Sequence, residues 1–156
     1  MMKSMNRFAP ALLASLLLLP AAFAQDLPEG KGKKIVDDVC SACHSTDLIM
    51  QFRDDKTDKA AWQGEVDRMV QRGADLKGDD VQTVISYLAK YLGPAVNVNQ
   101  AMAQDLQTEF DLSDQEAQAI VQYRKDKGNF KEWADLAKVS GVDGKKLEPF
   151  KIRITF

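Results

Sequence analysis

The stretch SDQEAQAIVQYRKDKG, residues 113–128, decides the fold of the C-terminal half of this chain. Ser113 and Glu116 form a capping-box pattern, in which each side chain accepts a hydrogen bond from the other residue's backbone N–H. Gly128 is a typical helix stop, because glycine readily adopts the backbone conformation that closes a helical end. The sequence therefore predicts a helix that runs from this cap to Lys127.

Shorter helical segments surround this helix. Asn99 is expected to cap a helix that runs through Phe110. Further helical turns are expected around 133–137 and 147–150, with a turn at 140–144 between them. The tail IRITF at the C-terminus is expected to extend like a short strand.

The N-terminal half has the same helical pattern. Apolar residues at helical spacing mark helices over 33–39 and from Trp62 to Gly73, and Asp79 with Gln82 suggests a capping box for a helix that ends at Gly93-Pro94. A chain of 156 residues holds one ordinary domain or two small ones. We therefore predict an all-α protein with domains at 25–93 and 95–156.

The first 24 residues have the pattern of a secretory signal peptide. Lys3 and Arg7 precede an apolar run that Pro20 interrupts, and small residues stand at Ala22 and Ala24. The run is shorter than the roughly 20 residues that span a bilayer. We expect cleavage after Ala24, a periplasmic location and no membrane span in the mature chain.

The charge of the mature chain argues against general attraction to nucleic acid. Removing Lys3 and Arg7 from the 21 basic residues leaves 19 against 23 acidic ones, a net charge of −4. Nucleic acid and anionic lipid are negatively charged and attract proteins with a positive net charge.

Both cysteines and the only histidine stand together in CSACH, residues 40–44. A thioredoxin-like dithiol requires a βαβ context that this sequence lacks. A zinc site requires four ligands, and a disulfide between Cys40 and Cys43 closes too small a loop to stabilise much. Covalent haem uses all three residues, with two thioether bonds and His44 as the proximal iron ligand. We therefore predict one haem c, with the disulfide as the alternative.

Residues 25–93 resemble a class I cytochrome c domain. The resemblance rests on GKGKKIVDDVC, on CSACH and on the ending YLAKYLG. It implies that the first and last helices cross beside the haem, with Tyr87, Leu88 and Tyr91 in contact with it. An ordinary aromatic core predicts the same burial.

A methionine is the expected sixth iron ligand, because the chain has no second histidine. The mature chain offers Met50, Met69 and Met102, and Met69 lies where the resemblance implies the distal methionine. The interval from His44 is short, however, and a helical methionine in this pattern is also typical of a core position. Arg53, Arg68 and Arg72 are candidates for pairing with the haem propionates, or simply solvated charges.

Residues 96–152 resemble the helix-hairpin-helix domain of bacterial competence DNA receptors. The stretches VNVNQA, AQAIVQYRKDKGNFKEWADL and KVSGVDGKKLEPF carry the resemblance, which implies two hairpins whose backbone N–H groups hold DNA phosphates. Asp111 and Ser113 replace the glycines of the first hairpin, and Asp143 replaces one in the second. A carboxylate repels phosphate. We therefore expect the fold to be kept and DNA binding to be lost, despite the neighbouring pair Lys145 and Lys146.

These observations together predict a periplasmic mono-haem c-type cytochrome that acts in electron transfer and is not an enzyme. Its C-terminal module would dock a redox protein, such as a periplasmic dehydrogenase, and nucleic acid is not an expected partner. Two alternatives stay open: a DNA-binding, uptake-type adaptor with a haem domain, and a haem-based sensor with an open iron site.

Overall fold

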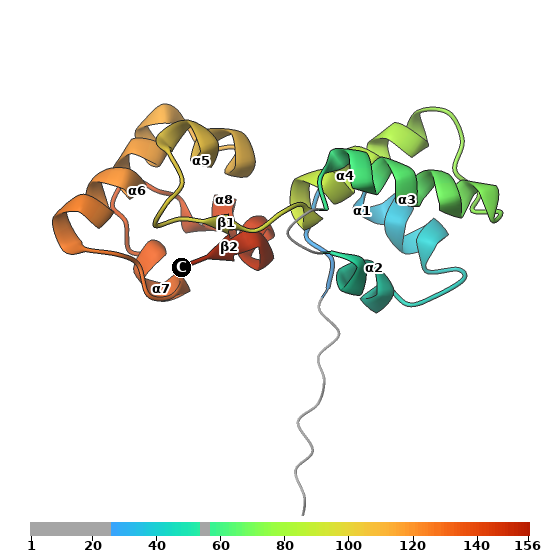
Figure 1. Ribbon diagram of the computed structural model, residues 1–156, viewed down its shortest axis with the longest axis horizontal. Coiled ribbons are helices and arrows are strands. Elements are labelled where there is room, and N and C mark those ends of the chain that lie inside the picture. Colours follow the sequence, from blue (N-terminus) through green and yellow to red (C-terminus); the bar gives the residue numbers. More distant parts are fainter. Residues whose placement is uncertain (1–25, 54–56) are drawn as a thin grey trace, which may run out of the picture.

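The computed structural model describes residues 26–53 and 57–156, which form two helical lobes joined by the segment after α4 (Figure 1). The predicted signal peptide, residues 1–24, lies outside the described residues. The predicted all-α class is confirmed, because the described part has only two short strands, β1 (Val96–Asn97) and β2 (Ile154–Thr155). Within that part, no helix is long and apolar enough to cross a membrane.

The N-terminal lobe contains α1 to α4 and the C-terminal lobe contains α5 to α8. The bounds in the first are α1 (Lys33–Ile35), a π-helical segment (Val36–Cys40), α2 (Asp47–Phe52), α3 (Lys59–Gln71) and α4 (Asp79–Leu92). Those in the second are α5 (Ala103–Phe110), α6 (Asp114–Lys127), α7 (Trp133–Leu136), α8 (Gly144–Leu147) and a 3₁₀ segment (Glu148–Arg153).

Helix α4 is the central element of the N-terminal lobe. It packs against α1 on one side and α3 on the other, and its buried face is Val84, Ile85, Tyr87, Leu88, Tyr91 and Leu92. Gly32 lets α1 approach this helix: its φ is 112°, and a Cβ there would lie 2.7 Å from the Cβ of Tyr87. No other residue fits that backbone and that space, so the glycine positions the segment that leads into CSACH.

Two predicted helix caps are wrong. Helix α4 begins after Gly78 without a side-chain cap, so Asp79 and Gln82 form no capping box. Helix α5 begins at Ala103 rather than near Asn99, whose amide exchanges two hydrogen bonds with the backbone of Phe130 at 2.8 and 2.9 Å. A contact between distant segments therefore replaces the local cap that the sequence suggests for Asn99.

The prediction for residues 113–128 is confirmed. Ser113 Oγ accepts from the Glu116 N–H at 3.3 Å, and the Ser113 N–H donates to the Glu116 carboxylate at 2.8 Å. The helix ends before Gly128, whose φ is 88°. The end of the IRITF tail is extended as expected, because Ile154 and Thr155 form β2, which pairs in parallel with β1, with Val96 opposite Ile154; Ile152 and Arg153 belong instead to the 3₁₀ segment. This pairing joins the beginning and the end of the C-terminal lobe.

Arg153 joins the two lobes. It is only 2% exposed, and its Nε donates to the carbonyl of Pro94 at 3.0 Å. Its guanidinium also donates to the carbonyl of Lys90, at the end of α4, and to the carboxylate of Glu109 on α5. One buried side chain thus holds α4, the connecting segment and α5 together.

We expect Arg153→Met to lower the free energy of unfolding by about 3 kcal/mol, because it leaves buried acceptors without a donor. Urea unfolding followed by circular dichroism measures the change. Lys151→Met is the control, since Lys151 is exposed and its pair with Glu148 is 3.9 Å long, and it should change stability by less than about 0.5 kcal/mol. Equal stability of the two variants would contradict the role of Arg153.

Candidate functional site

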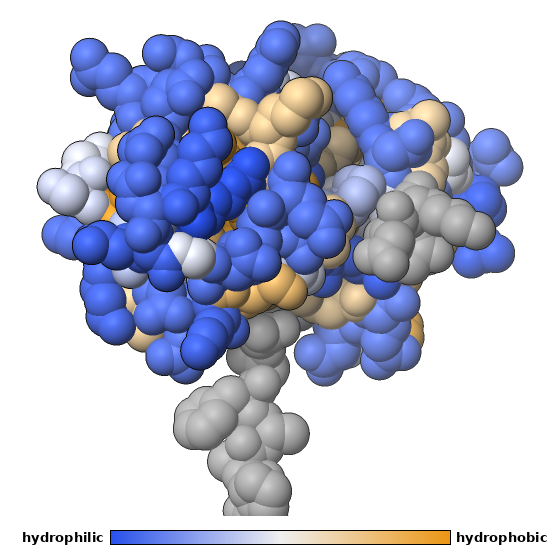
Figure 2. Space-filling model, turned by 60° about the vertical axis from the view of Figure 1, so that its left-hand side comes forward, coloured by the Kyte–Doolittle hydropathy of each residue, from blue (hydrophilic) through white to orange (hydrophobic). Residues whose placement is uncertain are grey.

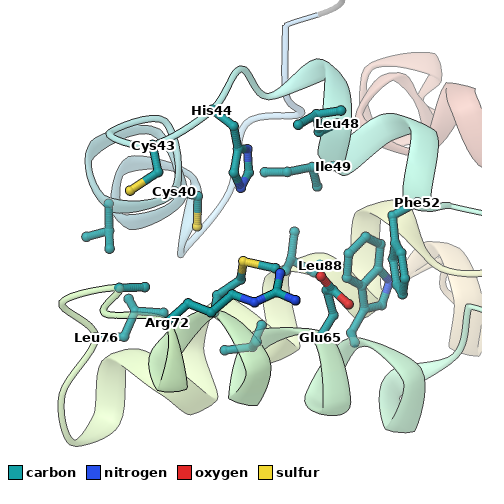
Figure 3. A pocket seen from close by; sticks show the side chains of 15 residues that line it. Cys40, Cys43, His44, Leu48, Ile49, Phe52, Glu65, Arg72, Leu76 and Leu88 are labelled. Carbon is teal, nitrogen blue, oxygen red and sulfur yellow. The ribbon is translucent and has the colours of Figure 1, made fainter.

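The N-terminal lobe contains an apolar cavity of about 410 Å³ between the CSACH segment, α2, α3 and α4 (Figure 3). Its volume lies within the usual range of ligand sites in proteins. Fifteen residues line it: Val39, Cys40, Cys43, His44, Leu48, Ile49, Phe52, Trp62, Glu65, Val66, Met69, Arg72, Ala74, Leu76 and Leu88.

The CSACH side chains form one wall of the cavity. Cys40 ends the π-helical segment, Cys43 and His44 follow in the turn, and His44 Nδ1 lies 3.1 Å from the carbonyl oxygen of Ser45. Both cysteines are free thiols. Burial, with a further contribution from the carboxylate of Asp37, raises the pKa of the Cys40 thiol. A raised pKa makes this thiol a poor nucleophile, which agrees with the sequence argument against a thioredoxin-like dithiol.

Helix α3 and the residue after it form the opposite wall. Glu65, Met69 and Arg72 line the cavity there, and Figure 3 shows Glu65 and Arg72 across the space from His44. The structure therefore brings all four predicted site residues, the two attachment cysteines and the two iron ligands His44 and Met69, around one cavity. Met50 lies outside the lining, and Met102 is 67% exposed in the other lobe.

Arg72 is a candidate arginine that the structure places at the cavity. Of the three candidate arginines, Arg53 donates to the carbonyl of Gly93 at 3.3 Å and Arg68 pairs with Glu65. Only Arg72 belongs to the cavity lining, and within the described part of the chain it forms no ion pair. Its spacing from Met69 on the same helical face is the signal that identifies it.

The donor set of the cavity fits a covalently held haem better than a bare metal ion. Among the described residues, no group of three or more histidine, cysteine, aspartate or glutamate side chains is placed to hold a metal. Haem brings four nitrogen ligands of its own, so the protein has to supply only axial ligands, attachment points and apolar walls. The cavity has one imidazole, one thioether, two thiols and mostly apolar walls.

The two hairpins of the C-terminal lobe form a second candidate site. The first hairpin, residues 111–113, links α5 to α6, and Asp111 adopts the left-handed conformation that glycine favours, with φ 53°. The second hairpin, residues 140–143, links α7 to α8, and Gly141 has φ 85°. The Asp143 carboxylate accepts from the backbone N–H of Lys145 at 3.0 Å.

Glu116 connects the two hairpins. The residue is only 7% exposed, and its carboxylate accepts from the Ser113 N–H and Oγ at 2.8 Å and from Lys146 Nζ at 2.9 Å. The hydrogen bonds from Ser113 and Lys146 lower the pKa of Glu116 to about 2. This carboxylate is therefore ionised at neutral pH and paired inside the protein.

Residues 93–155 match the family described as helix-hairpin-helix motif, and these residues form such a domain. The chain is 38% identical over 63 residues to ComE operon protein 1 of Bacillus subtilis, covering 40% of this chain and 31% of that protein. It is 46% identical over 59 residues to the endonuclease/exonuclease/phosphatase family domain-containing protein 1 of Xenopus laevis, covering 38% and 11%. The chain therefore spans at most about a third of these relatives. No solved structure matches it significantly.

These comparisons correct the functional prediction. They support the helix-hairpin-helix resemblance and not the cytochrome resemblance, and they favour the DNA-binding alternative. The predictions of an electron-transfer cytochrome, of a redox-protein partner and of no affinity for nucleic acid are therefore wrong.

The physical reason for this error lies in the carboxylates of the hairpins. Asp111 pairs with Lys90 and Glu116 pairs with Lys146, whereas Asp143 meets a neutral backbone N–H and not a cation. Counting Asp111 and Glu116 as free charges overestimates the repulsion of phosphate.

The pH dependence of stability tests the Glu116 contacts. A carboxylate with a lowered pKa contributes stability above its unfolded value, here 4.5, and loses it as the pH falls towards about 2. We expect Glu116→Gln to be less stable than the parent at pH 7, with the difference shrinking between pH 4.5 and 2. Urea unfolding across this range measures it. A difference that stays constant with pH would contradict the assignment.

Proposed function

We propose that this protein is a nucleic-acid-binding adaptor, in which the helix-hairpin-helix domain binds DNA phosphates and the N-terminal lobe carries a covalently attached haem. The observation that carries the proposal is the family match over residues 93–155, together with two hairpins that each have one residue at positive φ, Asp111 and Gly141. Binding of this kind uses the phosphate backbone and is independent of base sequence.

The surface around the second hairpin suits an approaching phosphate. Nothing lies within 4 Å of a Cβ built at Gly141 or Gly144, so the backbone there is open to a ligand. Lys145 and Lys146 follow directly and are both exposed. Figure 2 shows that the face turned towards the viewer is mostly hydrophilic, with small apolar patches between polar side chains. A polar surface with backbone amides and lysines is typical of phosphate contacts.

The names of these two relatives are consistent with this proposal. One is the product of a ComE operon, and the sequence resemblance above is to competence DNA receptors. The other belongs to an endonuclease/exonuclease/phosphatase family. The match covers only 11% of that second protein. We therefore propose nucleic-acid binding for the present chain and no catalytic activity.

For the N-terminal lobe we propose haem c as the cofactor. Cys40 and Cys43 would form the thioether bonds, His44 would be the proximal iron ligand and Met69 the distal one. Arg72 offers a cation to the propionates. The haem would supply an iron that changes oxidation state. Attachment of haem c takes place outside the cytoplasm, which agrees with the signal-peptide pattern and the proposed periplasmic location.

DNA binding is tested by titrating a labelled oligonucleotide with residues 25–156 at several salt concentrations. We expect Lys145→Ala to weaken binding several-fold for every base sequence and to lower the salt slope by about 1, because one phosphate contact is lost. Lys127→Ala is the matched control. It removes the same charge at the end of α6, a helix about 20 Å long whose other end carries Glu116, the partner of Lys146, and should change affinity by less than twofold. Failure of the parent to bind at low salt would overturn the proposed function.

Haem attachment is tested by exporting the protein in a cell that attaches haem c and measuring the mass of the intact chain. We expect one added haem in the parent and none in the Cys40→Ala, Cys43→Ala double variant, because both thioether bonds are then impossible. Met69→Ala should keep the added mass but lose the visible spectrum of methionine-ligated low-spin iron. Met50→Ala is its control and should leave that spectrum unchanged. A parent chain without haem would contradict the cofactor.

A further inference from the structure

The first hairpin is in contact with the other lobe. Asp111, its left-handed residue, pairs with Lys90 on α4. Phe110, immediately before it, packs on Phe150 with ring centroids 5.5 Å apart, and Phe150 stacks on Tyr91 of α4 at 5.3 Å. The hairpin therefore contributes to the joint between the two lobes, and the exposed carboxylate of Asp111 is already paired there with Lys90 of α4.

The other end of the first hairpin is closed by Glu116. The N–H and Oγ of Ser113, which would be free to meet a phosphate oxygen, both donate to this carboxylate at 2.8 Å. Lys146 binds the same carboxylate from α8 at 2.9 Å. The chain thus supplies its own anion at this position, and a phosphate would have to displace a paired, nearly buried carboxylate.

The second hairpin differs in each of these respects. Gly141 and Gly144 have open space where a side chain would begin. The first hairpin has the side chains of Asp111 and Ser113 instead. Lys145 is exposed and, within the described part of the chain, forms no ion pair. The one carboxylate of this hairpin, that of Asp143, accepts a hydrogen bond from the backbone N–H of Lys145 and not from a lysine side chain.

From this asymmetry we propose that nucleic acid binds only at the second hairpin, residues 140–143, and the adjoining start of α8 up to Lys146, while the first hairpin docks the helix-hairpin-helix domain onto the N-terminal lobe. The inference rests on the proposed function. One hairpin follows one sugar–phosphate strand, so the ligand is a single strand or one strand of a duplex. Duplex structure is then not required for binding.

Two matched asparagine variants test the division between the hairpins. Asp143→Asn keeps a side chain that accepts from the Lys145 N–H, and Asp111→Asn keeps a residue that tolerates the left-handed conformation. Each removes one negative charge. We expect Asp143→Asn to raise the affinity for a 12-nucleotide single strand about threefold, because it removes repulsion at the bound phosphate, and Asp111→Asn to change it by less than about 1.5-fold.

The possible outcomes distinguish a failure of the single-hairpin site from a failure of the proposed function. Three results together support the single-hairpin site: the parent binds, only Asp143→Asn gains affinity, and a duplex of the same length binds with an affinity per strand within about threefold of that of the single strand. An equal or larger gain for Asp111→Asn, or binding of duplex alone, would overturn it and leave the proposed function standing. Absence of binding by the parent at low salt would overturn both. Circular dichroism of each variant establishes that it is folded.

Discussion

The buried guanidinium of Arg153 is the interaction on which the arrangement of this molecule depends. It comes from the last helical segment of the chain but donates to carbonyls at the end of α4 and in the connection after it. A guanidinium has several donors in a fixed plane, so it can satisfy acceptors from separate segments at once. Gly93 makes room for this, since a Cβ there would lie 2.4 Å from the carbonyl oxygen of Ala89. These hydrogen bonds fix the orientation of the two lobes relative to each other.

The same helix that Arg153 holds also contributes to both candidate sites. Leu88 lines the cavity beside CSACH, and Lys90, two residues further on, pairs with the first hairpin. Residues two apart on a helix point in different directions. Helix α4 therefore presents one face to the cavity and another to the helix-hairpin-helix domain, so a helix, and not a linker, connects the cavity with the hairpins.

Local patterns in the sequence were enough to predict much of the fold. The capping box of Ser113 and Glu116 and the stop at Gly128 involve neighbours in the chain, and they are present as expected. Asn99 could not be predicted in this way, because its partner Phe130 lies 31 residues further along the chain. The cavity lining was partly predictable: CSACH is a contiguous motif, and Met69 and Arg72 lie on one helical face opposite it.

The hairpin electrostatics show why the function was harder to predict than the fold. From the sequence, Asp111, Glu116 and Asp143 are three carboxylates at a phosphate-binding surface. In the structure, Asp111 meets Lys90, which is 21 residues away on the other lobe, and Glu116 meets Lys146, which is 30 residues away.

The field at a site depends on which charges are paired, and pairing between distant residues is a property of the fold. The net charge of a sequence therefore excludes general attraction to nucleic acid but not binding at one hairpin whose backbone and lysine are left open.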